Sequence, residues 1–452
     1  MIKLPEDYSY IEMNPQLELA LDNIINTSEN LHIIGPAGVG KSTLIKIISD
    51  GRILKGTTVV VAPTGIAAVN ASSHGISATT IHSLLKLAPL TIYPDSLLRI
   101  KEELEGIIPQ IDNLIMDEAS MCNASLFDFM IEQIRLYRAK KEKDLPRIFI
   151  VADPFQLPPV ISKQDQEVKK YFDILYGGKY MYFSSLAFKD LNFVTIQLNK
   201  IYRQKDSSIQ NILNRIRQGT QTSEDLDILN QQVISEQDFA IKRKSYLYIS
   251  MYNQIVDEVN QSFLEVLDNP EYTFRADIKG NFDTSLARHL NPTVTLRKGY
   301  QVMVTKNSKD GPQDYANGTI GSVKEVYDYG PYDDQYVVIE TDSGRNIKIP
   351  RGDFSQYELV KNQESGEIEL KETGKFNQIL VRGAHALTVH KTQGITLDSL
   401  YFDMGKFIGT AGITYVALSR AKTLEGIGLS RKLRKNDILV NKEVLDFLSK
   451  LG

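Results

Sequence analysis

Eight residues, Gly35–Ser42 (GPAGVGKS), have the types and spacing of a loop that binds polyphosphate. The glycines let the backbone pass close to the phosphates, Lys41 can reach the outer phosphates, and Ser42 offers a hydroxyl to Mg²⁺. The apolar stretch Leu31–Ile34 predicts a buried strand leading into the loop, and Thr43–Ser49 predicts a helix whose first turn faces the anion. A plain glycine turn between a strand and a helix is the alternative.

Two adjacent carboxylates, Asp117 and Glu118, follow an apolar strand predicted at Leu114–Met116. In enzymes with a phosphate-binding loop, an acid here holds Mg²⁺ and a neighbouring acid orients or deprotonates the attacking water. Another predicted strand, Arg147–Val151, leads into a proline-stiffened loop that carries Gln156. Because parallel strands end at a common edge of their sheet, these groups are expected beside the phosphate-binding loop.

Residues of less specific type follow the predicted strand Thr57–Ala62. Pro63, Thr64 and Gly65 end that strand, where a ligand contact and an ordinary turn are both open interpretations. His82 lies at the start of an apolar helix. On its own, a histidine at such a place more often caps the helix or is satisfied by a neighbour than binds a ligand.

Length and composition limit the class of protein. The chain has 452 residues, of which 42% are hydrophobic, so two or three domains with substantial cores are expected. The formal net charge of −4 gives no global basicity, so a nucleic acid would have to bind along a local track. The single cysteine, Cys122, fits a reducing compartment, and no apolar run is long enough to span a membrane. A cytoplasmic location without a membrane partner is therefore expected.

The pattern changes in the second half of the chain. Another predicted strand, Val194–Leu198, leads to Arg203, and an α/β pattern follows. From about residue 291 to residue 380, the apolar runs become short and are closely punctuated by Gly, Asp, Asn and Pro. This pattern predicts a small β-barrel inserted in a second domain.

A later stretch, VHKTQGIT, gathers hydrogen-bond donors. His390, Lys391, Thr392 and Gly394 bring cationic, hydroxyl and amide groups onto one turn, and a solvated polar loop is the alternative. Arg420 comes after a further apolar run. These residues follow the predicted barrel, so they are expected in a domain other than the one that carries the phosphate-binding loop.

Together these features favour an enzyme that converts ATP into motion. Apolar strands that each end in a polar loop, with helical stretches between them, predict a doubly wound parallel sheet of the α/β class. Arg203 and Arg420 would reach the nucleotide from a second domain, so hydrolysis would depend on domain closure. An arginine finger contributes on the order of 10³ to 10⁵ in rate, and a one-domain kinase does not need one from another domain.

The ordered segments resemble the helicase motifs of the Pif-type family, in the RecD-like branch of superfamily one. They are GPAGVGKS, APTGIAA, TIHS, LIMDEAS, ADPFQLPPV, YRQ, VHKTQGIT and VALSRA. The resemblance runs from about Asn14 to Ala421, and NASLFDFMIEQIRLYR resembles the family's own signature segment. Val39 stands where the family usually has Thr, and Ala152 where many members have Gly, but neither is a reacting group.

The resemblance implies an order of domains. Residues 1–190 would form a first RecA-like motor domain with a short wedge near residues 70–78. Residues 191–290 and 381–452 would form the second RecA-like motor domain, and residues 291–380 an inserted SH3-like β-barrel. The composition and the absence of long extensions suggest a compact member from a bacterium or a phage-infected cell.

The resemblance also implies roles for single residues, with ATP and Mg²⁺ as cofactors. The catalytic residues would be Lys41, Asp117, Glu118, Gln156, Arg203 and Arg420. The nucleotide would be bound by Gln16, which would read adenine, and by Gly38, Gly40, Lys41, Ser42, Thr43 and Gly394. Mg²⁺ would be held by Ser42 and Asp117. Single-stranded DNA would be contacted by Pro63, Thr64, Gly65, His82, His390, Lys391 and Thr392.

The expected function is ATP-driven movement of a monomer along single-stranded DNA and unwinding of tailed duplex DNA. The 5′ to 3′ direction rests on the family resemblance alone. An RNA-directed motor of the same fold is one alternative, and a motor subunit of a recombination nuclease is another. A non-catalytic DNA-binding protein with a vestigial nucleotide site is a third, against which the intact set of catalytic residue types argues.

Overall fold

A computed structural model describes most of the chain, and the structural statements below concern the described residues alone. They are 8, 11–65, 67–68, 71, 76–87, 92–94, 98–161, 165–202, 207–235, 238–239, 246–282, 290–306, 308, 315, 319–330, 334–341, 343–361 and 368–451, with the backbone alone at 207–208, 356–361 and 368–371. The chain divides into two compact units. The first comprises Met1–Tyr202, Tyr357–Lys371 and Val440–Gly452, and the second comprises Arg203–Gln356 and Glu372–Leu439.

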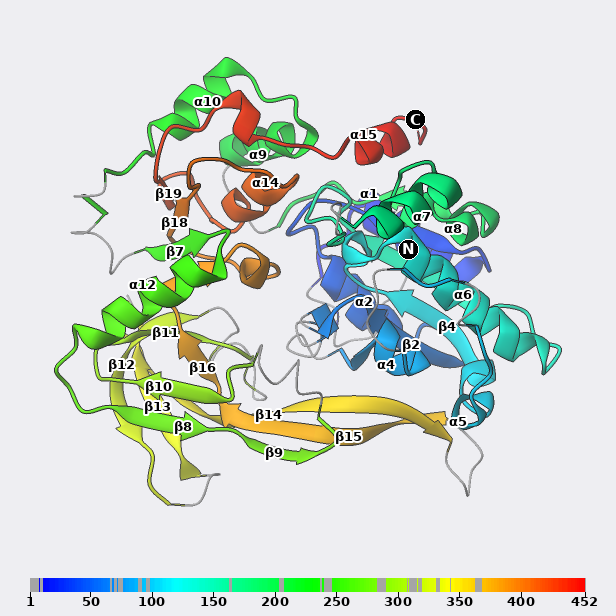
Figure 1. Ribbon diagram of the computed structural model, residues 1–452, viewed down its shortest axis with the longest axis horizontal. Coiled ribbons are helices and arrows are strands. Elements are labelled where there is room, and N and C mark those ends of the chain that lie inside the picture. The colour runs from blue at the N-terminus through cyan, green and yellow to red at the C-terminus, as the bar shows by residue number, and fades with distance from the viewer. Residues whose placement is uncertain are drawn as a thin grey trace. The chain divides into compact units, whose positions relative to one another are not determined.

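The first unit is built on a six-stranded sheet with the order β3-β2-β4-β5-β1-β6, of which β2 and β4 are labelled in Figure 1. Its strands are β1 (Leu31–Ile34), β2 (Thr57–Ala62), β3 (Ala78–Thr80), β4 (Ile111–Met116), β5 (Arg147–Ala152) and β6 (Val194–Gln197). Every neighbouring pair is parallel. Parallel neighbours need crossover connections, which place helices on the faces of the sheet.

Helices cover both faces of this sheet. They are α1 (Pro15–Asn26), α2 (Lys41–Ser49), α4 (Ile81–Leu85), α5 (Glu102–Glu105), α6 (Ala124–Ala139), α7 (Gln166–Tyr176), α8 (Leu186–Asp190) and α15 (Lys442–Leu448), with the short 3-10 helices η3 (Ile108–Gln110), η4 (Ala119–Met121) and η5 (Tyr182–Ser184). Leu114 and Met116 of β4 belong to one hydrophobic core with Phe127 of α6. Ile115 belongs to the opposite core with Leu44 of α2. This alternation along one strand produces the doubly wound arrangement.

The first unit ends later than the sequence analysis expected, because its sheet takes one more strand. β6 pairs with β1 in parallel, with Ile196 opposite Ile33, so the chain stays in the first unit to Tyr202 rather than leaving it at residue 190. The C-terminal helix also differs from the expected division. Val444 of α15 is fully buried in a core of the first unit, although residues 381–452 were assigned to the second motor domain.

The second unit contains a four-stranded parallel sheet with the order β17-β7-β18-β19. Its strands are β7 (Leu247–Ser250), β17 (Ala386–Thr388), β18 (Leu400–Asp403) and β19 (Ile427–Leu429). The helices of this unit are α9 (Ser207–Gln218), α10 (Ser223–Asn230), α12 (Asn253–Glu265) and α14 (Ile413–Leu418), with the 3-10 helices η8 (His390–Thr392) and η9 (Lys435–Asp437). The α/β class and the presence of two parallel sheets are thus as the sequence predicted.

The second unit also contains antiparallel β-structure, except that the end of β14 from Tyr357 and the start of β15 up to Lys371 belong to the first unit. A seven-stranded sheet has the order β16-β11-β12-β13-β14-β15-β9, and β10 pairs with β8. The strands are β8 (Tyr272–Arg275), β9 (Asp277–Gly280), β10 (Thr293–Leu296), β11 (Gln301–Val304), β12 (Ile320–Tyr327), β13 (Tyr336–Glu340), β14 (Asn346–Lys361), β15 (Ile368–Ile379) and β16 (Val381–Gly383). The β-region therefore begins near residue 272, earlier than the expected residue 291.

In the described part of the chain, no helix is both long and apolar enough to cross a membrane.

Candidate active site and nucleic-acid contacts

The phosphate-binding loop joins β1 to α2. Gly38 and Gly40 have φ angles of 81° and 89°, a left-handed conformation that favours glycine. α2 begins at Lys41, so the backbone amides of its first turn and the positive end of its dipole lie at the loop. Nζ of Lys41 donates to the carbonyls of Gly35 and Pro36, each at 2.9 Å, which holds the ammonium against the loop.

The segment that follows β6 braces this loop. The backbone N–H of Tyr202 donates to the carbonyl of Gly38 at 2.8 Å. The hydroxyl of Tyr202 accepts from Nδ2 of Asn14 at 2.7 Å, and Asn14 also caps α1 by accepting from the backbone N–H of Gln16 at 3.0 Å. The same tyrosine thus connects the loop with the first turn of the helix that carries Gln16.

β4 delivers Asp117 and Glu118 at its carboxyl end. The N–H of Asp117 donates to the carbonyl of Val61 at 2.9 Å, so the chain still follows the sheet there. Glu118 has a φ of 50°, a left-handed conformation that costs a non-glycine residue on the order of 1–3 kcal/mol and is often found at functional sites. Its N–H donates to the Asp117 carboxylate at 2.8 Å.

The electrostatics of this pair also involve the loop lysine. Burial, with the adjacent charge of Glu118, raises the pKa of Asp117 well above its ordinary value, whereas the charge of Lys41 acts in the opposite direction. The charges of Lys41 and Asp117 are therefore close enough to interact. The structure brings together the loop and the acids that the sequence predicted at one sheet edge.

Gln156 lies in the turn after β5 and is 6% exposed. Its backbone N–H donates to the carbonyl of Asp153 at 2.9 Å, and its Nε2 lies 3.4 Å from the Asp153 carboxylate. The sequence analysis gave no role to Asp153, which is fully buried. A carboxylate three residues before the glutamine, in a turn, is the signal that could have identified it as the group that positions Gln156.

The acids suit a metal ion that shares its ligands with a phosphate. The described residues contain no group of three or more His, Cys, Asp or Glu that could hold a metal by itself. Mg²⁺ binds typically through one or two carboxylates together with waters and substrate phosphates. Because two adjacent acids that are mostly withdrawn from water gain from a nearby cation, Asp117 and the Ser42 hydroxyl fit such a site.

The segment after β2 starts a helical turn. Thr64 Oγ1 accepts the backbone N–H of Ala67 at 3.2 Å, which is a capping contact. Thr64 and Gly65 are partly exposed and Pro63 is buried. The two partly exposed residues can therefore meet a ligand, whereas Pro63 shapes the turn.

His82, in α4, is held by a neighbour. Its Nε2 lies 2.7 Å from the hydroxyl of Tyr93, and burial lowers the pKa of His82. The ring is therefore neutral near pH 7, and a contact of this ring with nucleic acid would be a neutral hydrogen bond or a stacking contact.

Two other expectations, Arg203 and the wedge residues 70 and 72–75, lie outside the described residues. Ala78, expected at the end of the wedge, begins β3.

The polar turn of the second unit is the 3-10 helix η8, directly after β17. Thr392 is fully buried and its hydroxyl donates to the carbonyl of Val389 at 2.7 Å, so this side chain stabilises the turn. His390 and Lys391 are partly exposed, and burial lowers the pKa of each. Gly394, with a φ of 81°, is exposed. His390 and Lys391, rather than the Thr392 hydroxyl, are placed to meet a phosphate.

Arg420 follows α14 and is only 1% exposed. Its Nε donates to the carbonyl of Val416 at 2.9 Å and its Nη2 to the hydroxyl of Ser419 at 2.7 Å, while its Nη1 lies 3.5 Å from the carbonyl of Thr392. The guanidinium therefore contacts η8 within the second unit. A contact with a nucleotide would exchange these acceptors for phosphate oxygens.

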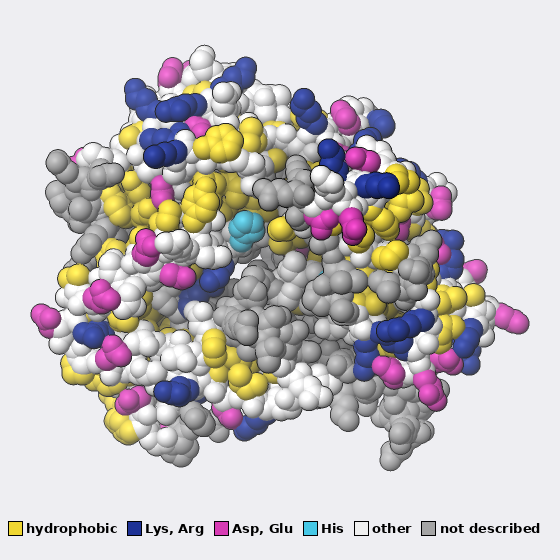
Figure 2. Space-filling model, viewed as in Figure 1, with side chains coloured by type: hydrophobic (Ala, Val, Ile, Leu, Met, Phe, Trp, Pro, Cys, Tyr) yellow, Lys and Arg dark blue, Asp and Glu magenta, His cyan; other side chains and the backbone are white. Residues whose placement is uncertain are grey.

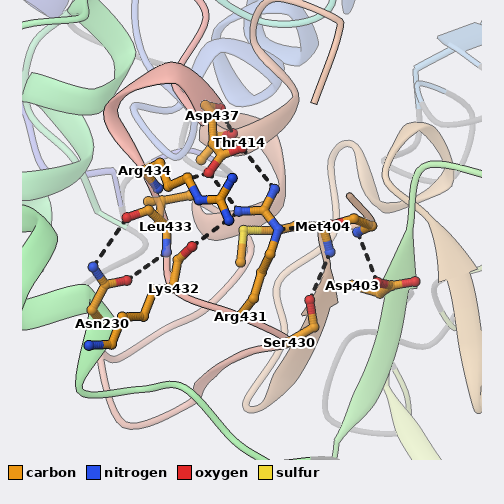
Figure 3. A network of polar contacts seen from close by, with 11 residues as sticks. Asn230, Asp403, Met404, Thr414, Ser430, Arg431, Lys432, Leu433, Arg434 and Asp437 are labelled. Carbon is orange, nitrogen blue, oxygen red and sulfur yellow. Dashed lines mark hydrogen bonds and ion pairs between the residues drawn. The ribbon is translucent and has the colours of Figure 1, made fainter. Parts of the chain in front are cut away.

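A polar network anchors the first turn of α14 (Figure 3). The hydroxyl of Thr414 donates to the carbonyl of Asp437, and the Asp437 carboxylate accepts two N–H groups of Arg431 at 2.7 and 2.8 Å. Asn230 bonds both the N–H and the carbonyl of Leu433. Bidentate guanidinium–carboxylate pairs are strong and directional, so the helix that precedes Ser419 is held in place.

Surface charge is mixed. On the face drawn in Figure 2, the coloured Lys and Arg side chains are interspersed with Asp and Glu side chains. The net charge of −4 agrees with this distribution. A bound polyanion would depend on local donors, such as those of η8, rather than on one broad basic field.

Comparisons with known proteins place these features in a context. The model of the PIF1-like helicase family matches residues 13–227. The ATP-dependent DNA helicase Pif1 of Campylobacter jejuni is 26% identical over 415 residues, which cover 87% of each chain. A crystal structure of Bacteroides Pif1 with ADP-AlF4 superposes with a TM-score of 0.84 at 28% identity, covering 97% of each chain. Bacteroides Pif1 with ADP-AlF3 and ssDNA gives 0.66 at 29% identity, covering 98% of this chain and 97% of the other.

Proposed function

We propose that this chain, which is a helicase of the Pif1 type, hydrolyses ATP to move along single-stranded DNA and to unwind tailed duplex DNA. One observation of the structure carries the proposal. The carboxyl edge of a single parallel sheet gathers the phosphate-binding loop, two carboxylates and a rigidly held glutamine, which are the groups that ATP hydrolysis requires.

The geometry at this edge supports a role for each residue. Lys41 neutralises the outer phosphates, and the backbone amides of Gly38, Gly40, Ser42 and Thr43 contact the phosphates. Asp117 and Ser42 hold Mg²⁺, which supplies charge neutralisation on the phosphates when it is bound.

Glu118 orients or deprotonates the attacking water, a role suited to a carboxylate in a left-handed backbone conformation directly after the strand. Gln156, held by Asp153, senses the terminal phosphate. Gln16 reads the adenine edge, since its side chain offers both a donor and an acceptor.

Two arginines complete the proposed hydrolytic set. Arg420 gives up its acceptors in the second unit and contributes its guanidinium to the transition state when nucleotide is bound. Arg203 acts with it. Arg420 also contacts the carbonyl of Thr392, so η8 loses this contact when Arg420 moves to the nucleotide. This loss would couple ATP hydrolysis to the binding of DNA by η8.

Single-stranded DNA is contacted by residues of both units. His390 and Lys391 hold phosphates from η8, whereas Gly394, which follows η8, contacts the nucleotide. Thr64, Gly65 and His82 contact the strand from the first unit. The active form is a monomer that moves 5′ to 3′.

Unwinding of tailed duplexes tests the proposal. Three labelled duplexes, with a 5′ single-stranded tail, a 3′ tail or no tail, are incubated with and without ATP. The proposal predicts strand separation that requires ATP and proceeds fastest with the 5′ tail. Faster unwinding of the 3′-tailed duplex would contradict the direction, and stimulation of ATP hydrolysis by an RNA oligomer but not by DNA would assign the motor to RNA.

A further inference from the structure

Arg382 occupies a position to which the sequence analysis gave no role. It is the central residue of β16, where it lies opposite Met303 of β11. The following Gly383 packs so closely that a Cβ there would come within 2.6 Å of the Tyr300 hydroxyl. The side chain of Arg382 therefore projects from a strand that is tightly fixed, which is a suitable base for a precise contact.

The guanidinium of Arg382 has few partners. Its Nη2 lies 3.5 Å from the carbonyl of Lys391, its Nε is closed off from solvent without a hydrogen-bond partner, and among the described residues it forms no ion pair with a carboxylate. Burial lowers the pKa of Arg382 to about 10. A cation taken out of water without a counter-charge is unfavourable unless a ligand supplies the opposite charge.

Arg351, a buried arginine of the same unit, shows the contrast. Arg351 donates from Nε to Asn377 at 2.8 Å, from Nη1 to Gln335 at 3.0 Å and from Nη2 to the carbonyl of Arg275 at 2.6 Å. Its donors are used inside the protein, as expected of a structural arginine. The donors of Arg382 are not used in this way, so a purely structural role does not account for it.

A second cation lies beside it. Burial, and then the charge of Arg382, lower the pKa of Lys391, while Asp257 acts in the opposite direction. Among the described residues, the Lys391 ammonium interacts with the charges of Arg382 and Asp257, without a hydrogen bond or an ion pair. Two neighbouring cations, both partly withdrawn from water, form a site that favours an anion.

We propose that Arg382 is a phosphate ligand of the single-stranded DNA track, and that it binds the sugar-phosphate backbone together with Lys391. The inference rests on the proposed function. A planar guanidinium on a rigid strand suits two oxygens of one phosphodiester, and the ammonium suits the same or the next phosphate as a point charge. The contact is to phosphate, so it confers affinity without base preference.

Salt-dependent binding tests this inference. Fluorescence anisotropy measures the affinity of the full chain for an oligothymidylate at several salt concentrations, for the wild type, Arg382→Gln, Arg382→Lys, Lys391→Gln and the double Arg382→Gln/Lys391→Gln variant. Arg382→Gln is expected to bind about 10-fold more weakly near 0.1 M salt. Its plot of log affinity against log salt should be shallower by about 0.7, the contribution of one phosphate on a single strand.

The other variants separate charge from geometry. Arg382→Lys keeps the charge, so it should keep the wild-type slope while losing part of the affinity. The double variant should lose less affinity than the two single losses combined, because both groups act on the same stretch of backbone. Lys432→Gln removes an exposed positive charge from the same unit and serves as the matched control, with wild-type slope and affinity expected.

Two further measurements identify the ligand. An oligomer with abasic sites should show the same loss on Arg382→Gln, since its phosphates remain. Inorganic phosphate at the same ionic strength should compete weakly and equally for wild type and variant if the site takes a DNA backbone rather than free phosphate.

A wild-type slope and affinity in Arg382→Gln, with DNA binding by the wild type intact, would overturn the inference. A lowered melting temperature with an unchanged slope in both Arg382 variants would overturn it as well and leave a structural role. Absence of DNA binding by the wild type itself would count against the proposed function instead.

Discussion

The lysine of the nucleotide loop and the cations of the polar turn are held in opposite ways. Lys41 already donates to two backbone carbonyls at 2.9 Å, so its charge is compensated within the first unit. Lys391 and Arg382 lie side by side in the second unit, and burial lowers the pKa of each. Among the described residues, neither forms an ion pair with a carboxylate. The first arrangement exchanges bonds when a phosphate arrives, and the second gains bonds that it lacked.

This difference has a consequence for specificity. A ligand at Lys41 must offer more than the loop carbonyls already provide, which favours a polyphosphate with its metal ion over a single weak anion. A ligand at the second-unit pair is favoured by its charge alone, which suits a repeating backbone whose bases are not read. In the proposed function, the first unit therefore carries a selective site and the second a tolerant one.

The largest effect is expected from removing the lysine of the selective site. Lys41→Ala should abolish ATP hydrolysis and unwinding, because it removes the ammonium that is held against the loop carbonyls of Gly35 and Pro36. Steady-state ATPase assays with saturating single-stranded DNA measure this. Lys46→Ala, on an exposed position of the same helix, should keep the wild-type rate. If Lys41→Ala retained DNA-stimulated hydrolysis, Lys41 would not belong to the nucleotide site, and the contrast with Lys391 and Arg382 would not hold.

A large effect is also expected from Arg420, which we propose to contact the nucleotide. Arg420→Lys keeps the charge but loses the planar guanidinium, so kcat for ATP should fall by on the order of 10³ while the KM for ATP changes little. Arg434→Lys, at an exposed arginine of the same unit, serves as the control and should leave kcat unchanged. A lowered melting temperature with wild-type kcat would assign Arg420 to the packing of α14 and η8 alone.

A smaller effect should reveal how the strand that leads into the loop responds to pH. His32 of β1 is fully buried, with Nε2 2.6 Å from the Tyr182 hydroxyl and Nδ1 3.2 Å from the Thr195 hydroxyl, and burial lowers its pKa to about 3. The unfolded chain binds a proton below about pH 6.5, whereas the folded chain does not. The stabilisation is therefore complete above that pH and is lost as the pH falls towards 3.

The loss should approach about 1.4 kcal/mol per pH unit between pH 6 and pH 4 for this one group. The measurement is the difference in unfolding free energy between wild type and His32→Gln across that range, which cancels the contribution of the carboxyl groups. Amide exchange should place the change in β1 and leave β7 of the second unit unaffected. Equal pH dependence in both proteins would show that His32 is protonated in the folded state.

Much of the nucleotide site could be predicted because its signals are local. The loop needs glycines at fixed spacing, and the acids and Gln156 each follow an apolar strand by one to five residues. Parallel strands then carry such residues to the same edge. The family and the two parallel sheets were predicted correctly on this basis, while the roles of the single residues stay predictions.

Other features could not be predicted because they depend on distant partners. β6 joins the first sheet through its register with β1, and Glu443 of α15 accepts the N–H groups of Tyr180 and Met181 from far along the chain. The sequences of β6 and α15 alone do not indicate which of the two units each element joins. The hydroxyl of Thr392 was expected on a phosphate, and only the fold of the turn shows it bonded to Val389.

The sequence by itself determined what chemistry the chain carries, since residue type and short-range spacing suffice for a phosphate loop, an acid pair and a donor-rich turn. The tertiary structure alone decided which cations are satisfied and which are not. Arg351 and Arg382 are indistinguishable as letters, yet the first is surrounded by acceptors and the second lies beside another cation. The reason is physical: the free energy of a buried charge depends on groups brought to it by the fold, and sequence neighbours do not reveal them.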